Sequence, residues 1–266
     1  MTTEQWNLLK VWKEKRQGHV WIVQSDRGRN GYFKFANPAH SYDSGPLIAN
    51  EWISAQLAVM LGFPVAQLQH TQVIGPDGKL QDGLVSIQVD AREIATWGKV
   101  EKKVRQRAEK YVSHVELLKM LVVFDVWIGN IDRASGKNLV LYRNDRNDRY
   151  EWYLIDHGHA LFGAPKKWHS HQWNEPYWRR PWLFYHVPEG LLRLQVNLHN
   201  LEPMLTRVEQ VSDETIDNVL GSVPKSHLNE EEHQFIRRWL ITRRGQVRQM
   251  MRDWVNYRGV KEYNRK

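Results

Sequence analysis

The chain has 266 residues, a formal net charge of +8 and no cysteine. This length is enough for one large domain or for two lobes with a substantial core. The lack of cysteine excludes disulfides and thiolate metal sites. No N-terminal segment looks like a secretory leader, and no apolar run reaches the roughly 18 residues that a membrane span needs. We therefore expect a soluble cytoplasmic protein.

The positive charge is concentrated at the C-terminal end of the chain. Residues 237–266 contain ten Lys/Arg against Asp253 and Glu262, so this segment carries the whole net charge. We expect a solvated helix face, because no nucleic-acid-binding motif accompanies the charge. The alternative is a binding surface for nucleic acid, an acidic protein or an anionic membrane. The arginines concerned are Arg237, Arg238, Arg243, Arg244, Arg248 and Arg252.

The N-terminal third predicts a small lobe of strands. "HVWIVQSDRGRNGYFKFA" (19–36) has β-branched and aromatic residues on both sides of a polar turn, which predicts a β-hairpin with Lys34 in its second strand. Residues 68–90 predict short strands around the turn "GPDGK".

One helix is expected within this lobe. In "PLIANEWISAQLAVMLGFPVA" (46–66), apolar residues recur at the helical period, and Gly62 and Pro64 follow as stop signals. Glu51 lies in the first half of this helix. We expect residues 1–90 to form a β-rich lobe and residues 91–266 a mostly helical one, in an α+β fold.

The second lobe begins with a buried helix. "SHVELLKMLVVFDVWIG" opens with Ser113 and Glu116, the pattern of a capping box, and is apolar almost throughout to Gly129. "NLVLY" and "YEWYLIDHG" then predict a second hairpin, and the remainder is predicted helical. The last helix is expected from Asn229, with Glu232 three residues on, to about residue 257.

An aromatic segment follows the second hairpin. "WHSHQWNEPYWRRPW" (168–182) could hold a substrate, but we expect most of its rings, Trp173 and Trp178 among them, to anchor the segment on the helical lobe.

Four separated segments supply polar groups of one chemical kind. Lys34 lies on a strand, Glu51 on the next helix, Asp132 and Asn138 in the loop of "WIGNIDRASGKNLVLY", and Asp156 at a strand end. Phosphoryl transfer needs a cation on the nonreacting phosphates, oxygen ligands for magnesium and a carboxylate directed at the attacking hydroxyl. The sequence therefore predicts a site for ATP and Mg²⁺, with Asp132 acting on the acceptor.

These segments resemble the HipA-like kinase family, bacterial relatives of the protein-kinase and phosphoinositide-kinase fold. The resemblance rests on "GYFKF", "ANEWISAQLAVMLGFPVA", "FDVWIGNIDRASGKNLVL" and "YLIDHGHAL", and covers roughly residues 19–162. It implies a bilobal fold with ATP in the cleft and "GLVSIQV" as the connector near adenine.

The resemblance also implies a role for each candidate. Lys34 would be the strand lysine, Glu51 its helix partner and Asp132 the catalytic residue, with Asn138 and Asp156 as metal ligands. Gly28 and Gly31 are the candidates for a glycine loop near the nucleotide, in place of a full G-x-G-x-x-G motif. The implied acceptor is a protein Ser or Thr, while the fold also hosts kinases of lipids and small metabolites.

Two other classes of protein stay open. A metal hydrolase could use Asp156 with His157, His159, His169 and His171. A pseudokinase, or a nucleic-acid or partner-binding module, could use the basic C-terminal helix without turnover.

Overall fold

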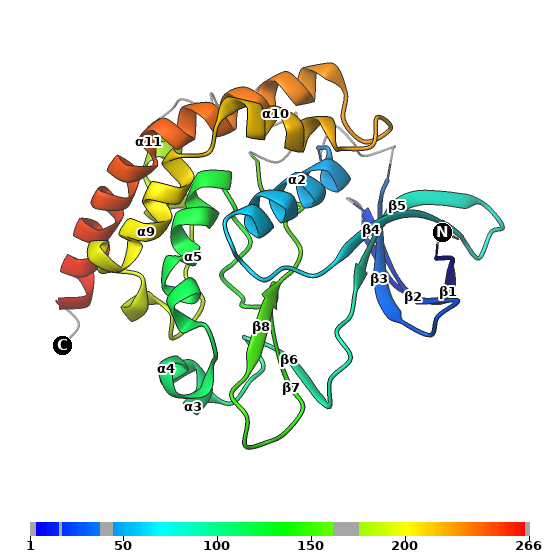
Figure 1. Ribbon diagram of the computed structural model, residues 1–266, viewed down its shortest axis with the longest axis horizontal. Coiled ribbons are helices and arrows are strands. Elements are labelled where there is room, and N and C mark those ends of the chain that lie inside the picture. The colour runs from blue at the N-terminus through cyan, green and yellow to red at the C-terminus, as the bar shows by residue number, and fades with distance from the viewer. Residues whose placement is uncertain (1–3, 16–17, 38–44, 162–175, 264–266) are drawn as a thin grey trace.

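A five-stranded antiparallel sheet forms the N-terminal part of the molecule (Figure 1). Its strands are β1 (Trp6–Lys15), β2 (Gly18–Ser25), β3 (Asn30–Ala36), β4 (Leu68–Ile74) and β5 (Leu80–Ile87), in the order β1-β2-β3-β5-β4. The structure is a computed structural model that describes residues 4–15, 18–37, 45–161 and 176–263.

Side-chain alternation on β3 gives this sheet two different faces. Phe33 and Phe35 are buried and pack with Trp21 in a small core of the sheet. Tyr32 and Lys34 alternate with them and are only partly buried. Because successive strand residues point to opposite faces, Lys34 projects away from the aromatic core.

Helix α2 (Leu47–Met60) follows β3 in sequence but belongs to a different core. Its buried residues, among them Ile53 and Leu57, join the large cluster formed by the helical part of the molecule. Trp52 Nε1 also donates a hydrogen bond to Ser222 Oγ on the helical side, at 2.9 Å. The helix that carries Glu51 is therefore fixed to the helical part and presents Glu51 toward the sheet.

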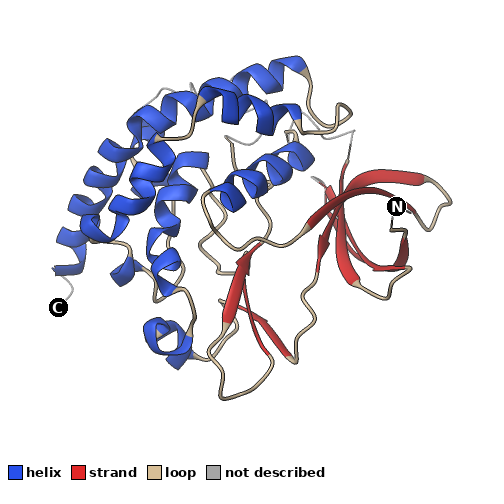
Figure 2. Cartoon of the chain, viewed as in Figure 1, coloured by secondary structure: helices blue, strands red, loops and turns tan. Residues whose placement is uncertain are grey.

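The second part of the chain contains a small antiparallel sheet and most of the helices (Figure 2). The sheet has the order β6-β7-β8, with strands β6 (Glu93–Thr96), β7 (Leu139–Arg143) and β8 (Glu151–Leu154). The helices are α3 (Lys102–Gln106), α4 (Ala108–Tyr111), α5 (Val115–Ile128), α7 (Pro176–Arg179), α8 (Pro181–Phe184), η2 (Leu192–Leu194), α9 (Leu198–Glu209), α10 (Asp213–Gly221) and α11 (Glu230–Tyr263). No helix among the described residues is long and apolar enough to cross a membrane.

The expected α+β architecture is confirmed, with strands concentrated in the N-terminal part and helices in the C-terminal part. The expected hairpins correspond to β2–β3 and β7–β8, and the strands around "GPDGK" to β4–β5. Strand β1 was not anticipated. The proposed division at residue 90 falls between β5 and β6 and stays a prediction.

The capping box expected at the start of α5 is wrong. His114 occupies the N-cap with φ 51°, in the left-handed region, and no side chain caps the helix there. The backbone N–H of Ser113 instead donates to Tyr150 O at 2.9 Å, so Ser113 is bound to the neighbouring hairpin. The box at the start of α11 is confirmed: Glu232 N donates to Asn229 Oδ1 at 2.9 Å, and Asn229 N to Glu232 Oε2 at 3.0 Å.

Helix α11 fixes the end of α5 through one buried arginine. Arg243 Nε donates to Val126 O at 3.1 Å and to Trp127 O at 3.0 Å, the last carbonyls of α5, and Nη1 donates to Trp178 O at 2.7 Å. Burial lowers the pKa of Arg243 to about 9, which still leaves the guanidinium charged at neutral pH. A cation at a helix C-terminus is stabilised by the helix dipole, so this contact terminates α5 at a defined residue.

The described aromatic residues near residue 180 anchor their segment on the helical part, as expected. Trp178 is buried and packs edge-on against Trp239, with ring centroids 5.6 Å apart, and Trp182 stacks on Tyr257 at 4.6 Å. Trp173 lies outside the described residues.

We expect Trp178→Ala to lower the free energy of unfolding by about 3–5 kcal/mol, because it leaves a large cavity beside Trp239. Urea denaturation measures this change. Leu183→Ala is the control, since the Leu183 side chain is exposed and its loss should have an effect of no more than about 0.5 kcal/mol. If Trp178→Ala kept the parent stability and instead raised the KM for the substrate, Trp178 would contact the substrate and would not anchor the segment.

Candidate active site

Lys34 lies between two carboxylates that come from distant parts of the chain. Its Nζ is 3.2 Å from Glu51 Oε2 on α2 and 2.8 Å from Asp156 Oδ1 after β8. The expected ion pair between Lys34 and Glu51 is confirmed. Burial favours the neutral amine, but the charges of Glu51 and Asp156 outweigh it and raise the pKa of Lys34. The ammonium therefore stays charged at any physiological pH.

Glu51 also binds the backbone after β8. Its Oε1 accepts a hydrogen bond from Asp156 N at 3.0 Å, and its Oε2 accepts one from His157 N at 2.8 Å. The side chain is 4% exposed, so the carboxylate is surrounded by these partners and Lys34. One buried carboxylate thus joins β3, α2 and the segment after β8.

Asp156 has an unusual backbone conformation and an accessible side chain. Its φ is 59°, in the left-handed region that non-glycine residues rarely adopt. Backbone strain of this kind is concentrated at functional sites. The side chain is 42% exposed, and the charge of Lys34 lowers the pKa of Asp156 to about 2 despite the opposing effect of burial. A permanently ionised, accessible carboxylate suits a cation ligand.

The loop after α5 is held by a buried ion pair. Arg133 Nη2 lies 2.9 Å from Asp125 Oδ1, and both side chains are fully buried. Asn130 Nδ2 donates to the same carboxylate at 2.8 Å, and Arg133 Nη1 donates to Asn138 O at 2.7 Å. These bonds connect the helix to both ends of the loop, so the loop has a fixed shape.

Gly129 permits the close approach of α11 at the start of this loop. Its φ is 67°, and a Cβ at this position would lie 2.6 Å from Trp239 Cζ2. Glycine is therefore needed here for two reasons. The helix ends on a residue in the left-handed conformation, and the ring of Trp239 leaves no space for a Cβ atom.

Asp132 and Asn138 face one another across the loop, as the sequence predicted. Asn138 Nδ2 donates to Asp132 O at 2.8 Å, to Asp132 Oδ2 at 3.2 Å and to Asp156 O at 3.4 Å. Asp132 is exposed, whereas Asn138 is buried. The five predicted groups from β3, α2, the loop and the end of β8 are therefore gathered in one place.

The structure does not bring Gly28 and Gly31 to this cluster. Gly28 lies in the β2–β3 turn, and Gly31 pairs with Val23 at the same end of the ladder, whereas Lys34 pairs with Val20 nearer the other end. At the lysine's end of the sheet, the neighbouring β1–β2 ladder pairs Lys15 with Gly18. The sequence prediction did not include β1, so it took β2–β3 as the first hairpin of the sheet and placed the glycine loop in the turn of that hairpin.

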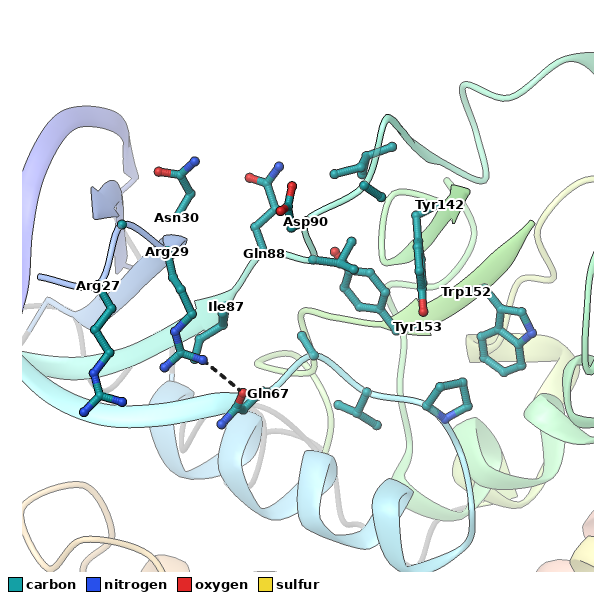
Figure 3. Close-up of a pocket in the computed structure, with 17 residues that line it drawn as sticks. Arg27, Arg29, Asn30, Gln67, Ile87, Gln88, Asp90, Tyr142, Trp152 and Tyr153 are labelled. Carbon is teal, nitrogen blue, oxygen red and sulfur yellow. Dashed lines mark hydrogen bonds between the residues drawn. The ribbon is translucent and has the colours of Figure 1, made fainter. Parts of the chain in front are cut away.

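Gly28 instead borders a separate cavity of about 710 Å³ (Figure 3). The β2–β3 turn with Arg27 and Arg29 lies on one side of it, Tyr142 and Tyr153 lie on the other, and residues 64–67 run between them. The connecting segment 87–91 also lines it. The Lys34 cluster contributes no lining residue to this cavity.

Sequence reasoning missed Asp125, Asn130 and Arg133 as supports of the loop. The available signal was Asp125 itself, a carboxylate within the apolar run of α5. A charge at such a position needs a partner, because burying it alone is highly unfavourable. The basic residue eight positions later supplies that partner.

The histidines of the metal-hydrolase hypothesis are not gathered into a metal-binding group within the part of the chain that the structure describes. His157 is fully buried, which together with the charges of Arg133 and Lys34 lowers its pKa well below 6.5. His169 and His171 lie outside the described residues.

Comparisons with known proteins identify a family and a fold for this chain. A family model described as HipA-like kinase matches residues 42–245. Among solved structures, the Helicobacter pylori proinflammatory kinase CtkA superposes with a TM-score of 0.59 at 12% identity, covering 93% of this chain and 96% of that one. A Golgi casein kinase with Mn/ADP bound has a TM-score of 0.49 at 12% identity, covering 92% and 74%. The comparison with curated proteins finds no match. The CtkA superposition confirms a kinase-like fold.

The buried ion pair should be essential to stability. Asp125→Asn leaves Arg133 charged and buried without its counterion, so we expect the free energy of unfolding to fall by about 3–5 kcal/mol. Glu109→Gln is the control, because it breaks the half-exposed pair with Arg193 and should lower stability by about 1 kcal/mol at most. Chemical denaturation of both variants measures the difference. Equal losses would contradict a structural role for the Asp125–Arg133 pair.

Proposed function

Because this chain belongs to the HipA-like kinase family and is a phosphotransferase, we propose that it transfers the γ-phosphate of ATP, with Mg²⁺, to a hydroxyl group. The observation that carries this proposal is the contact of Lys34 with both Glu51 and Asp156. This contact brings a cation next to the carboxylate that would bind the metal, and the hydrogen bond from Asn138 Nδ2 to Asp156 O brings the loop of Asp132 and Asn138 beside them. Phosphoryl transfer depends on such positioning more than on covalent chemistry.

The residues present fit a nucleotide with a hard divalent cation. Lys34 would contact the nonreacting phosphates, held in place by Glu51. Asp156 and Asn138 offer carboxylate and amide oxygens, the ligands that Mg²⁺ prefers. Asn138 uses Nδ2 for its bonds to the loop, so Oδ1 is the atom it would offer to the ion. The bound cation would neutralise charge on the transferring phosphoryl group.

Asp132 would orient the acceptor hydroxyl and receive its proton. It is the exposed member of the cluster, and its backbone is fixed by bonds to Asn130 and Asn138. An exposed carboxylate on a rigid loop can meet a side chain that projects from another protein. This supports a protein Ser or Thr as the acceptor, as the family implies, with a small-molecule hydroxyl as the alternative.

The roles of Asp132 and Asp156 can be separated by substitution. Asp132→Asn should leave the affinity for Mg-ATP nearly unchanged and lower kcat by about 10²-fold or more, on the general-base scale of about 10²–10⁴. Asp156→Ala should abolish magnesium-dependent nucleotide binding as well as turnover. Calorimetry with and without Mg²⁺, beside phosphate-transfer rates with cell extract as acceptor source, measures both.

Asp148→Asn is the matched control, since Asp148 is an exposed aspartate in the β7–β8 turn. It should bind Mg-ATP and transfer phosphate at the parent rate. Our assignment fails if Asp132→Asn also transfers at the parent rate, or if Asp156→Ala binds Mg-ATP normally. Tight ATP binding by the parent protein without any transfer would identify a pseudokinase.

The alternative that uses the basic C-terminal helix is weakened by intramolecular pairing. Arg237 Nε lies 2.5 Å from Asp217 Oδ1, Arg244 pairs with Asp213, and Arg248 pairs with Glu202 and Glu209. Arg243 is buried against α5. Of the six arginines considered, Arg238 and Arg252 are the exposed ones. Among these six arginines, the charge available to an external partner is therefore that of Arg238 and Arg252.

We therefore expect Arg238→Glu with Arg252→Glu to leave phosphate transfer and RNA affinity unchanged. Arg146→Glu, on the exposed β7–β8 turn, controls for the removal of positive charge. Binding is measured by fluorescence anisotropy at two salt concentrations. A recruitment role would appear as weaker binding and a salt slope reduced by about one unit for each RNA phosphate that the variant no longer neutralises.

A further inference from the structure

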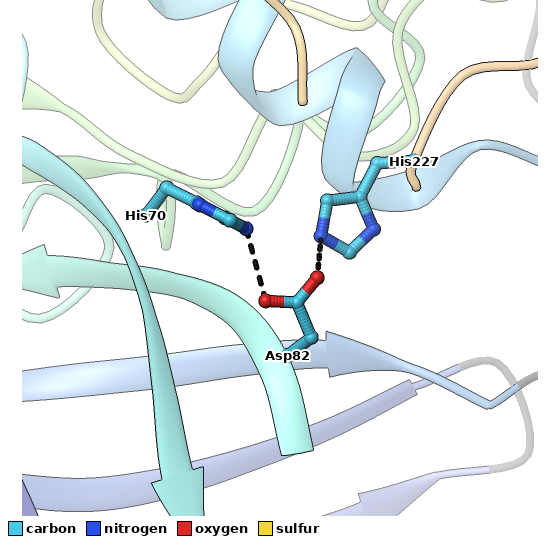
Figure 4. Close-up of side chains that lie close together, drawn as sticks. All are labelled: His70, Asp82 and His227. Carbon is cyan, nitrogen blue, oxygen red and sulfur yellow. Dashed lines mark ion pairs between the residues drawn. The ribbon is translucent and has the colours of Figure 1, made fainter. Parts of the chain in front are cut away.

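Two histidines and one aspartate meet where the N-terminal sheet contacts the helical part (Figure 4). His70 lies on β4 and pairs with Leu84 on the adjacent strand β5. Asp82 lies on β5 two residues before Leu84. The two side chains therefore share one face of the sheet. His227 comes from the loop between α10 and α11, almost 150 residues later in the chain.

The three side chains converge through potential ligand atoms. His70 Nε2 lies 3.0 Å from Asp82 Oδ1, and His227 Nε2 lies 3.0 Å from Asp82 Oδ2. The ligand atoms of the three residues all lie within 4.8 Å of one another. Neighbouring nitrogen and oxygen ligands of a tetrahedral zinc ion are roughly 3.3–3.5 Å apart, given bond lengths of about 2.0–2.2 Å. Small rotations of the side chains would bring the three atoms to that spacing.

Burial gives a second, independent indication of a ligand. Both Nε2 atoms and Asp82 Oδ1 are shielded from solvent, yet none of them makes a well-directed hydrogen bond with another described residue. Buried polar atoms almost always have well-directed hydrogen bonds, so three buried atoms whose mutual contacts lack that geometry need an explanation. An ion shared by all three would satisfy them together.

We propose that His70, Asp82 and His227 bind a divalent transition-metal ion of the zinc class, with water as the fourth ligand. Imidazole nitrogens favour zinc and related metals, whereas Mg²⁺ and Ca²⁺ favour oxygen ligands. Ser226 Oγ donates to Asp82 Oδ2 at 3.1 Å and would orient the carboxylate, as partners of metal ligands commonly do.

The site would join two parts of the molecule. Two ligands belong to the sheet that carries Lys34, and the third belongs to the helical part that carries Asp132. The α10–α11 region also meets α2 through the bond between Ser222 and Trp52. A bound ion would hold the β4–β5 edge against this region and restrict movement between the sheet and the helices. None of the three ligands belongs to the Lys34 cluster, so the site is independent of the proposed kinase chemistry.

The test uses the full chain without a polyhistidine tag, because such a tag binds zinc itself. Zinc is titrated against a competing chromophoric chelator in the absence of nucleotide, and Co²⁺ is added separately to record the absorption bands of a tetrahedral site. We expect one ion per chain, and a thermal transition that zinc raises and a chelator lowers. His227→Gln and Asp82→Asn should each weaken zinc binding by about 100-fold or more.

His199→Gln is the matched control, since His199 is an exposed histidine on α9 in the same part of the chain. It should bind zinc like the parent. Circular dichroism in the presence of chelator checks that each variant is folded. If Asp82→Asn does not fold, His227→Gln alone tests the proposal. Residue 227 lies in a loop, so we expect this variant to fold. Absence of stoichiometric zinc binding by the parent, or equal binding by His227→Gln, would leave only a set of histidine–aspartate contacts and overturn the proposal.

Discussion

The site depends on the buried carboxylate of Glu51. It binds the ammonium of Lys34 and the backbone N–H groups of Asp156 and His157. These bonds give the sheet, α2 and the end of β8 one common polar contact. Because α2 packs into the helical core, Glu51 positions Lys34 relative to the helical part and not only within its own sheet. The position of a single helix therefore sets the distance between the lysine and the carboxylate of Asp156.

A second buried charge, Asp125, shapes the loop on the other side of the site. It binds Arg133 and Asn130, while Arg243 from α11 caps the helix on which Asp125 lies. Arg243 shows that the C-terminal helix contributes to the loop's geometry from a distance, through the carbonyls of α5. Part of the basic charge that the composition reveals is thus structural, and it acts on the protein's own helix ends and carboxylates.

The sequence predicted what depends on local patterns and failed where distant segments decide. The β-branched and aromatic residues around Lys34 and the helical period around Glu51 correctly predicted the strand and the helix on which these residues lie. The capping box at Ser113 failed because the backbone of that residue binds Tyr150 in the neighbouring hairpin. The sequence prediction did not include β1 and took the β2–β3 turn at Gly28 as the first hairpin turn, whereas Gly28 and Gly31 lie at the end of the β2–β3 ladder away from Lys34.

The same distinction applies to two arrangements of distant residues. The predicted site included Lys34 and Asp156 but not their direct ion pair, and the sequence did not predict the approach of His227 to Asp82. The contact between Lys34 and Asp156 spans 122 residues, and the approach of His227 to Asp82 joins a loop to a strand across the molecule. No spacing in the sequence encodes either contact, because each follows from how α2, α10 and α11 pack against the sheet. The two arrangements connect the sheet to the helical part at separate places. A movement that separates the two parts must therefore break polar contacts at both places.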